Sequence, residues 1–361
     1  MVILFTALTA VLALFTLLPL ARIDAWPVRV LDFPRLQIAV LWALQIIALC
    51  LFLGVNTTAA MILLAIALAC FAYQLWWILP YTKLYRCEVK SCQDIDPQHT
   101  ISIITANVLT PNRNAQALIK QVRQLAPDLL ITLESDQWWQ DQLDLLSNDY
   151  PYTLKCPLDN LYGMHLYSRL ALQDAKIEFL VERDKPSMHA QVVLRSGDII
   201  GCHFLHPAPP SPTENSQSSE RDAELLVVAA SLKDITRPII VTGDLNDVAW
   251  SRTTKTFRRI SRLLDPRIGR GMFNTFHAQY RLLRWPLDHV FHSDHFSLVR
   301  MQRLKPFGSD HFALFTQLAY TPQRQEAQQD CPSASAAEKE FAHDKIAQQN
   351  TNPEKVPTAS D

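Results

Sequence analysis

Two long apolar stretches open the chain. The first runs from Val2 to Ala21 without a charged residue, and the second runs from Leu36 to Thr82 with one interruption near its middle, Gly54-Val55-Asn56-Thr57-Thr58. A helix needs about 20 apolar residues to cross the hydrocarbon core of a bilayer, so the second stretch has room for two helices, over Leu36–Val55 and Ala59–Pro80. The pattern therefore predicts a membrane anchor of three transmembrane helices in residues 1–82, followed by a juxtamembrane linker over residues 83–99.

The first stretch is interpreted as an anchor and not as a cleaved signal peptide. No basic segment precedes it, the apolar run is long, and no clear Ala-x-Ala site follows it. Trp26, Trp76 and Trp77 fall near the ends of the predicted helices, where aromatic rings settle at the level of the lipid headgroups.

Basic residues flank some of the predicted helices and not others. They follow the first and third helices, at Arg22, Arg29, Arg35, Lys83, Arg86 and Lys90, and are absent from the other two flanks. Because Lys and Arg accumulate in cytoplasmic loops, this distribution favours a cytoplasmic position for the rest of the chain. Asp24 and Asp32 lie in the same first loop, so the orientation stays open.

From residue 100 onward, short apolar runs end beside polar residues. Such runs, bounded by Gly or Pro, are typical of buried strands, so the polar side chains are expected at strand ends. The segments are Ile101–Val108 with Asn107, Leu129–Leu133 before Glu134, Ile199–Leu205 before His206, Pro238–Thr242 before Gly243-Asp244-Leu245-Asn246, Leu287-Asp288-His289, and Gly308-Ser309-Asp310-His311 before Phe312–Phe315. A helical pattern over Asn114–Leu125 separates the first two runs.

Carboxylates, carboxamides and an imidazole gathered at one sheet edge suit a particular chemistry. Oxygen ligands hold Mg²⁺, while neutral and cationic donors meet the oxygens of a phosphate ester. A lone Asp or Asn at a strand end is more often a turn or capping residue, so the inference rests on the whole ordered set.

This ordered set of motifs resembles the endonuclease/exonuclease/phosphatase superfamily, over about residues 100 to 320. The resemblance is closest to the bacterial membrane-anchored branch, in which a His-Pro-x-Pro-Pro sequence, here His206 to Pro210, follows the middle strand. Two positions depart from the usual pattern, Ala106 and His289, and neither removes a ligand. The resemblance implies an α/β fold, a four-layer sandwich of two mixed β-sheets flanked by helices, preceded here by the three transmembrane helices.

The resemblance also implies roles for single residues. Glu134 would be the principal ligand of Mg²⁺ or Mn²⁺, with Asn107 beside it and Asp310 at a second metal position. Asp244 would orient and deprotonate the attacking water, and Asn246 would donate to a phosphate oxygen or to the nucleophile.

The remaining roles fall to two histidines and an aspartate. His311 would contact the phosphate, and Asp288 would accept its second N–H and fix its orientation. His206 would contact the phosphate or protonate the leaving oxygen. His203 competes with His206, but strand periodicity puts the two on opposite faces, and the adjoining prolines favour His206.

A cluster of His289, His292, Asp294 and His295 is predicted to be a solvated turn, because no partner is spaced to complete a closed zinc site. Asp288 is favoured over Asp294 as the site residue, because Asp294 sits in a polar loop.

Residues 251–284 carry nine Lys and Arg against one Asp, Asp265. Such a stretch is either a solvated face or a contact for a phosphate-rich partner, either nucleic acid or an anionic membrane. The second interpretation is slightly favoured, and its candidate phosphate or nucleic-acid contacts are Arg258, Arg259, Arg262 and Arg267.

These observations predict a catalytic domain over residues 100–320 and, because large apolar residues are scarce, a disordered tail over residues 321–361. The predicted function is a divalent-metal-dependent phosphoesterase, foremost a phosphodiesterase or nuclease-like hydrolase, anchored in a bacterial inner membrane. Its substrate would be a nucleic acid, a lipid headgroup or a sugar phosphate. A lipid-headgroup phosphodiesterase, an inositol-type phosphatase and a catalytically silent binding protein are the alternatives.

Overall fold

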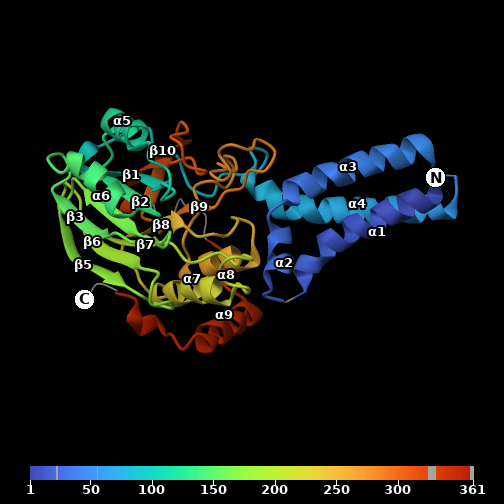
Figure 1. Ribbon diagram of the computed structural model, residues 1–361. Coiled ribbons are helices and arrows are strands. Elements are labelled where there is room, and N and C mark those ends of the chain that lie inside the picture. The colour runs from blue at the N-terminus through green and yellow to red at the C-terminus, as the bar shows by residue number, and fades with distance from the viewer. Residues whose placement is uncertain (22, 55, 324–330, 358–361) are drawn as a thin grey trace. The chain divides into compact units, whose positions relative to one another are not determined.

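The computed structural model describes residues 1–21, 23–54, 56–323 and 331–357 (Figure 1). Arg22 and Val55, both used in the helix predictions, and residues 324–330 and 358–361 of the tail lie outside this description. The chain forms two compact units. The helical unit comprises Met1–Arg86 with the short segments Pro210–Ser218 and Gly269–Gly271, and the sandwich unit comprises the rest.

The helical unit contains three long helices, α1 (Val2–Leu17), α3 (Arg35–Phe52) and α4 (Thr58–Ile78), and the short helix α2 (Trp26–Arg29). With their 3₁₀ extensions, the long helices form three segments, Val2–Leu20, Arg35–Phe52 and Thr58–Tyr81, that are long and apolar enough to cross a membrane. The predicted boundaries agree with these within a few residues. Thr57 starts α4 by accepting a hydrogen bond from the backbone N–H of Ala60.

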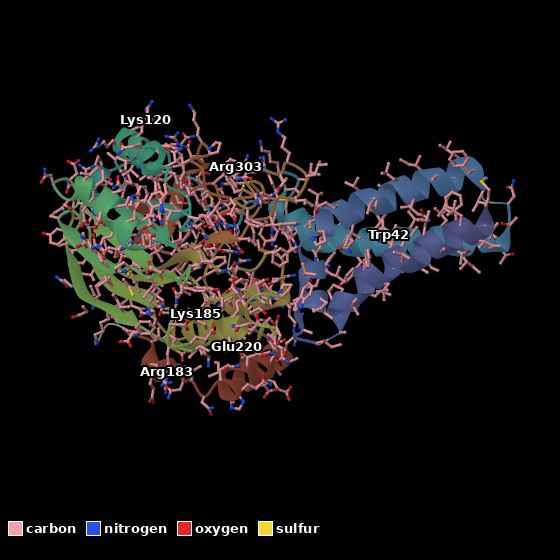
Figure 2. The ribbon with its side chains drawn as sticks, in the orientation of Figure 1. Trp42, Lys120, Arg183, Lys185, Glu220 and Arg303 are labelled. Atoms are coloured by element: carbon pink, nitrogen blue, oxygen red, sulfur yellow. The ribbon has the colours of Figure 1, made fainter. Side chains whose placement is uncertain are left out.

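Polar contacts join the three long helices. Trp42 lies inside the helical unit (Figure 2) and donates its indole N–H to Thr16 Oγ1 at 2.9 Å. Gln74 donates to the same hydroxyl at 3.3 Å, and Gln45 donates to Thr9 Oγ1 at 3.1 Å. Such polar groups need partners within apolar surroundings, and here α1 supplies those partners to α3 and α4.

The sandwich unit contains two mixed sheets, ordered β10-β11-β1-β2-β4-β3 and β5-β6-β7-β8-β9. Within each sheet one neighbouring pair is parallel, β1 with β2 and β7 with β8. The strands are β1 (Thr100–Asn107), β2 (Leu129–Leu133), β3 (Tyr152–Cys156), β4 (Met164–Ser168), β5 (Leu172–Glu178), β6 (Ser187–Val193), β7 (Ile199–Leu205), β8 (Ile239–Asp244), β9 (Asp288–His292), β10 (Phe296–Arg303) and β11 (Leu314–Tyr320). The helices are α5 (Ala115–Leu125), α6 (Gln137–Leu143), α7 (Ser219–Ser231), α8 (Arg252–Ser261) and α9 (Ala336–Gln348).

Three apolar clusters define the layers of the sandwich unit, and the sheets and helices of these layers can be followed in Figure 1. Ile103 of β1 and Phe204 of β7 belong to the cluster between the sheets. Ile104, the next residue of β1, points the other way and packs with α5 and α6. Val241 of β8 packs with α7 and α8 on the outer face of the second sheet. The order helix, sheet, sheet, helix confirms the predicted four-layer α/β sandwich.

The prediction of a disordered tail is wrong for the segment that contains α9. Ser335 and Glu338 form a capping box at the start of this helix, and Ala342 is buried in the same cluster as α7 and α8. Glu338 also pairs with Arg259 at 2.6 Å. Composition misled the prediction, because a helix that lies on an existing domain needs only a few apolar side chains when the domain supplies the rest of the contact.

Candidate functional site

The candidate site begins where the central strands of the two sheets face each other. The hydroxyls of Thr105 in β1 and Thr242 in β8 are 2.8 Å apart across the sandwich. Two residues further along each strand, on the same faces, lie Asn107 and Asp244. Asn107 donates its side-chain N–H to Asp244 Oδ2 at 3.1 Å. The alternation that builds the core thus brings these two predicted residues together.

Glu134 follows β2, the parallel neighbour of β1, and lies beside Asn107. Asn107 donates to Glu134 Oε1 at 2.7 Å, and Thr110 donates to the Glu134 carbonyl at 2.7 Å. Burial raises the pKa of Glu134 to about 7, although the hydrogen bond from Asn107 opposes that shift. Glu134 adopts a left-handed backbone with φ 56°, which costs about 1–2 kcal/mol for a residue with a side chain. The surrounding contacts therefore hold this carboxylate in place at an energetic cost.

Asp244 ends β8 and is 1% exposed. Its Oδ1 accepts the backbone N–H of Asn246 at 2.9 Å. Gly243 precedes it because a Cβ there would lie 1.9 Å from the Leu205 carbonyl of the neighbouring strand β7. Burial raises the pKa of Asp244, against the opposing charge of His311. This carboxylate is accordingly more basic than an Asp in water.

The side chain of Asn246 is engaged in a contact within the protein. Its side chain donates to the Pro207 carbonyl at 3.0 Å, and its own carbonyl accepts from Arg221 at 2.9 Å. It also has a left-handed backbone, with φ 50°, which Asn tolerates better than most residues. Asn246 therefore fixes the loop after β8 and joins it to the His206-Pro207 segment.

His311 stands between two buried carboxylates. Its Nδ1 is 2.8 Å from Asp288 Oδ2, and its Nε2 is 3.4 Å from Asp244 Oδ2. Asp288 pairs with Asp244 in register across β8 and β9. Burial alone would lower the pKa of His311, but Asp244 and Asp288 outweigh it and raise this pKa to about 10. His311 is therefore an imidazolium at neutral pH, and it donates its Nδ1–H to Asp288, the contact that the family resemblance implies.

Ser309 and Asp310 complete the loop that carries His311. Ser309 donates its hydroxyl to the Asn107 carbonyl at 2.8 Å and accepts the His311 backbone N–H at 3.0 Å. Asp310 is half-buried, and Ser309 is 3.4 Å from its Oδ1. No role for Ser309 was predicted from the sequence, although this residue lies between Gly308 and Asp310 in the motif that ends at His311. It ties the loop before β11 to the end of β1.

His206 is 2% exposed, and burial lowers its pKa to about 4, with Asp244 and His311 among the charges that act on it. The centroids of the His206 and Tyr162 rings are 5.1 Å apart, and Lys185 Nζ lies 4.7 Å from the centroid of that tyrosine ring. Lys185 is labelled in Figure 2. Lys185 was not predicted as a residue near the site, because its only signal in the sequence is its position among acidic neighbours. A neutral His206 can donate or accept a hydrogen bond but carries no charge at neutral pH.

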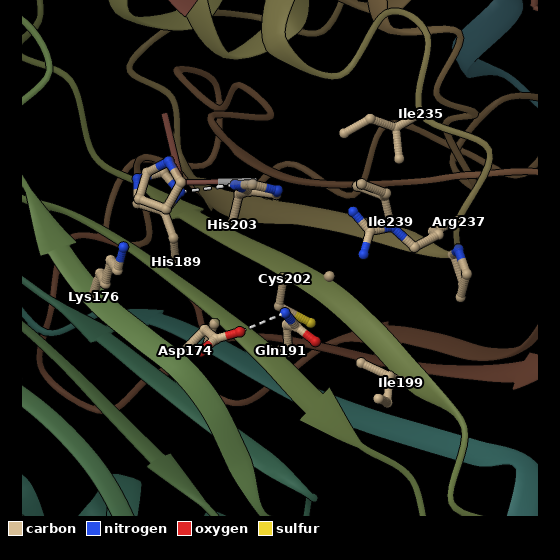
Figure 3. Close-up of a pocket in the computed structure, with 14 residues that line it drawn as sticks. Asp174, Lys176, His189, Gln191, Ile199, Cys202, His203, Ile235, Arg237 and Ile239 are labelled. Carbon is tan, nitrogen blue, oxygen red and sulfur yellow. Dashed lines mark hydrogen bonds between the residues drawn. The ribbon is translucent and has the colours of Figure 1, made fainter. Parts of the chain in front are cut away.

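His203 points to the other face of its sheet, as the strand periodicity predicts. It lines a cavity of about 240 Å³ on the outer side of β5, β6 and β7, where its Nδ1 is 2.8 Å from Nδ1 of His189 (Figure 3). Burial lowers the pKa of His203 to about 4. This pair is separate from the residues around Asp244.

The prediction of a solvated turn at His289, His292, Asp294 and His295 is wrong for its histidines. His289 and His292 belong to strand β9 and are fully buried, and His295 is 8% exposed. His289 contacts Arg267 at 2.7 Å and the Asp247 carbonyl at 2.9 Å. Polar residues in a strand were mistaken for a loop because their partners are distant in sequence.

Most of the arginines proposed as phosphate contacts are engaged inside the protein. Arg258 donates to both oxygens of Glu88 at 2.6 Å, and Arg267, fully buried, pairs with Asp265 at 2.8 Å. Arg259 pairs with Glu338 of α9, as described above. Arg262 follows α8 and is exposed. The high local charge of the sequence is therefore largely compensated in the fold, and the prediction of a phosphate or nucleic-acid contact is wrong for Arg258 and Arg267.

Two groups of side chains could hold a cation. Ligand atoms of Asp244, Asp288 and His311 lie within 4.8 Å of one another, but His311 already contacts both carboxylates and, as an imidazolium, has no free lone pair for a metal. Glu134 fits better, because its Oε2 is buried and makes no hydrogen bond among the described residues. With the amide oxygen of Asn107 and the half-buried Asp310, it offers the oxygen donors that Mg²⁺ or Mn²⁺ prefers.

The fold has known relatives in solved structures. The human Nocturnin catalytic domain with bound sulfate anion is 18% identical, with a TM-score of 0.52 over 63% of this chain and 97% of that one. TDP2 of D. rerio, humanized by 14 mutations, is 17% identical, with a TM-score of 0.51 over 61% and 99%. An endonuclease/exonuclease/phosphatase from Bacteroides vulgatus is 16% identical, with a TM-score of 0.50 over 61% of this chain and 99% of that one. These likenesses show the fold.

Sequence comparison assigns the family. No functionally curated protein matches the chain. The model of the Endonuclease/Exonuclease/phosphatase family matches residues 104–311, a span that starts in β1 and ends at His311. It includes the strand ends described above and more than half of the chain. The chain therefore belongs to the Endonuclease/Exonuclease/phosphatase family.

Proposed function

We propose that this protein is a divalent-metal-dependent phosphoester hydrolase, foremost a phosphodiesterase, held at a membrane by its helical unit. One observation carries the proposal. A buried basic carboxylate, Asp244, lies between the Asn107–Glu134 pair and the His311–Asp288 pair, at the ends of strands from both sheets. A structural core has no need for this arrangement, because burying three carboxylates and an imidazolium is costly.

Asp244 is the candidate general base. Its Oδ1 is fixed by the Asn246 N–H, and its Oδ2 meets both Asn107 and His311. Burial raises its pKa, so it accepts a proton from an attacking water more readily than an exposed Asp. Its position at the end of β8 gives that water a fixed direction of approach.

His311 is the candidate phosphate contact. As an imidazolium it has two N–H donors, one of which points to Asp288 while the other lies on the Asp244 side. A phosphoester oxygen that approaches Nε2 would meet a preorganised positive charge in a site shielded from water. His206, neutral and buried, would offer a hydrogen bond to the phosphate or the leaving oxygen.

The divalent cation would be held by Glu134, Asn107 and Asp310. A bound Mg²⁺ or Mn²⁺ supplies Lewis-acid charge to a phosphoryl oxygen and lowers the pKa of a coordinated water. The unpaired Oε2 of Glu134 is the observation that fits this role. Ser309 would keep Asp310 and His311 in register with Asn107.

The first test is activity of the full chain in detergent or nanodiscs on a bis-aryl phosphodiester, with Mg²⁺, with Mn²⁺ and with excess chelator. We expect turnover with the cations and none with the chelator. The Asp244→Asn variant, purified in the same way, is the control for a contaminating hydrolase. Turnover that persists in chelator, or that Asp244→Asn leaves unchanged, would overturn the proposed function.

A further inference from the structure

A hairpin-like loop over residues 276–285 emerges from the sandwich unit beside the candidate site. At its base, the Phe276 N–H donates to the Trp285 carbonyl at 3.1 Å, and further out the His277 N–H donates to the Leu283 carbonyl at 3.1 Å. Arg284 donates to the carbonyls of His277 and Ala278 at 3.2 and 2.8 Å. These bonds give the loop a defined shape up to its tip, residues 280–283.

The base of this loop is bonded to the segment that carries His311. The Ala278 N–H donates to the Asp310 carbonyl at 2.6 Å, and the Phe312 N–H donates to the Thr275 carbonyl at 2.9 Å. The ring of Phe276 lies 5.0 Å from the ring of His311. The tip is therefore connected to a candidate catalytic residue through a few direct contacts.

The tip has an unusual composition for a water-exposed loop. Tyr280, Leu282 and Leu283 are 58%, 84% and 48% exposed. Other large apolar side chains that the described part of the sandwich unit exposes, such as Leu145 and Phe179, stand apart from one another along the chain. The loop is also basic, because residues 276–285 contain two Arg, Arg281 and Arg284, and no Asp or Glu. Apolar side chains flanked by arginines are typical of segments that enter the headgroup region of a bilayer.

A bilayer suits this tip better than a protein partner does. A stable protein interface buries about 800 Å² on each side, which three side chains on a narrow tip do not provide. The chain itself contains three helices long and apolar enough to cross a membrane, and only residues 82–99 separate the last of them from β1. Even fully extended, this linker spans at most about 60 Å. The sandwich unit of an anchored chain is thus confined to the vicinity of a lipid surface.

We propose that the tip of the 276–285 loop inserts into the bilayer headgroup region and that the substrate is a phosphoester in the headgroup of a glycerophospholipid. The inserted Tyr280, Leu282 and Leu283 bring the site to the lipid, and Arg281 favours anionic membranes. The contacts of Phe276 and Ala278 with the His311 segment align the site with the membrane surface. This inference rests on the proposed hydrolase function and adds its substrate class.

The test uses the full chain in nanodiscs that contain phosphatidylcholine with phosphatidylglycerol, phosphatidylethanolamine or phosphatidic acid, assayed for released headgroup and lipid product. The bis-aryl phosphodiester is assayed in the same discs. For Leu282→Asp we expect at least about a tenfold fall in lipid hydrolysis, because one inserted leucine contributes that much to partitioning, and bis-aryl turnover within about twofold of the original chain.

Leu145→Asp is the matched control, because Leu145 is 58% exposed and belongs to a different element, the short 3₁₀ helix Asp144–Leu146. We expect it to leave both activities within about twofold. Arg281→Ser should reduce the advantage of anionic over neutral discs. Bis-aryl turnover without hydrolysis of any of these lipids, or lipid hydrolysis equally insensitive to Leu282→Asp and Leu145→Asp, would overturn the inference alone. Absence of bis-aryl turnover would instead overturn the proposed function beneath it.

Discussion

His311 and His203 are both buried in the sandwich unit, yet their surroundings give them opposite charge states. His311 is 4% exposed and stands between Asp288 and Asp244, which raise its pKa to about 10. His203 is also 4% exposed, and its nearest polar partner is another imidazole, His189. Burial therefore dominates and lowers the pKa of His203 to about 4.

The difference between them teaches what burial does and does not decide. Removing an imidazole from water favours its neutral form, and only a nearby carboxylate reverses that preference. The contact between His189 and His203 needs only one proton between the two Nδ1 atoms, so one neutral imidazole can donate to the other and neither ring has to be charged. The His311 cluster keeps several charges in a buried place, an arrangement that is typical of functional sites.

Among the substitutions that test this comparison, replacing Asp244 is expected to have the largest effect on activity. Asp244→Asn keeps the shape of the side chain and removes both the base and one of the charges beside His311. We expect kcat on the bis-aryl phosphodiester to fall by at least about two to three orders of magnitude. Steady-state kinetics with a thermal unfolding control measures this. A folded variant with a near-normal rate would show that the buried charges serve stability alone.

Asp288→Asn should act through His311 and have the next largest effect. Without this carboxylate the imidazolium loses its 2.8 Å partner, and its pKa moves down from about 10. We expect kcat/KM to fall by about one to two orders of magnitude. Because the active form is the cation, the loss of activity as pH rises should begin at a lower pH than in the original chain.

The measurement for Asp288→Asn is the profile of kcat/KM between pH 6 and pH 10. Asp294→Asn is its control, because Asp294 lies in the loop after β9 and its side chain is 47% exposed. We expect that control to match the original profile. An Asp288→Asn enzyme with an unchanged alkaline limb would mean that His311 is not the titrating group.

Metal binding should depend on pH through Glu134, whose pKa burial raises to about 7. A metal needs the carboxylate, so protons compete with it as pH falls below this value. We expect the apparent affinity for Mn²⁺ to weaken by about tenfold for each pH unit below 7. Titration of the full chain at pH 5.5, 6.5 and 7.5 tests this. Glu134→Gln should bind weakly with little pH dependence, and an equally steep dependence in that variant would exclude Glu134 as the ligand.

The sequence was sufficient to place the candidate site because its residues follow from local signals. Asn107, Glu134 and Asp244 each come at the end of an apolar run, and an apolar run locates a strand end. Two parallel neighbours and two facing sheets then bring those ends together. The family pattern supplied the rest, including the partnership of Asp288 with His311.

Other features depend on partners that lie far away in the chain, and the sequence could not place them. Arg258 meets Glu88, which precedes it by 170 residues, and Arg259 meets Glu338 of α9. When only the local sequence of a basic stretch is considered, its distant acidic partners are not visible and its side chains are expected to be exposed. The direction of Asn246 toward the Pro207 carbonyl and the cation of Lys185 over Tyr162 depend on loop conformations that have no periodic signal.

The smallest effect on activity is expected for a substitution of His203, the neutral histidine of the two. Because His203 lies outside the candidate site, His203→Gln should leave turnover of the bis-aryl phosphodiester within about twofold. Its effect should appear in stability instead. The folded pKa of about 4 is below the ordinary 6.5, so the unfolded chain binds the proton more readily and His203 costs stability as pH falls from about 6.5 towards 4. At pH 5 this amounts to about 2 kcal/mol. The thermal unfolding midpoint of the original chain should therefore fall between pH 7.5 and pH 5 by more than that of His203→Gln, whereas equal falls in the two chains would mean that His203 is as easily protonated when folded as when unfolded.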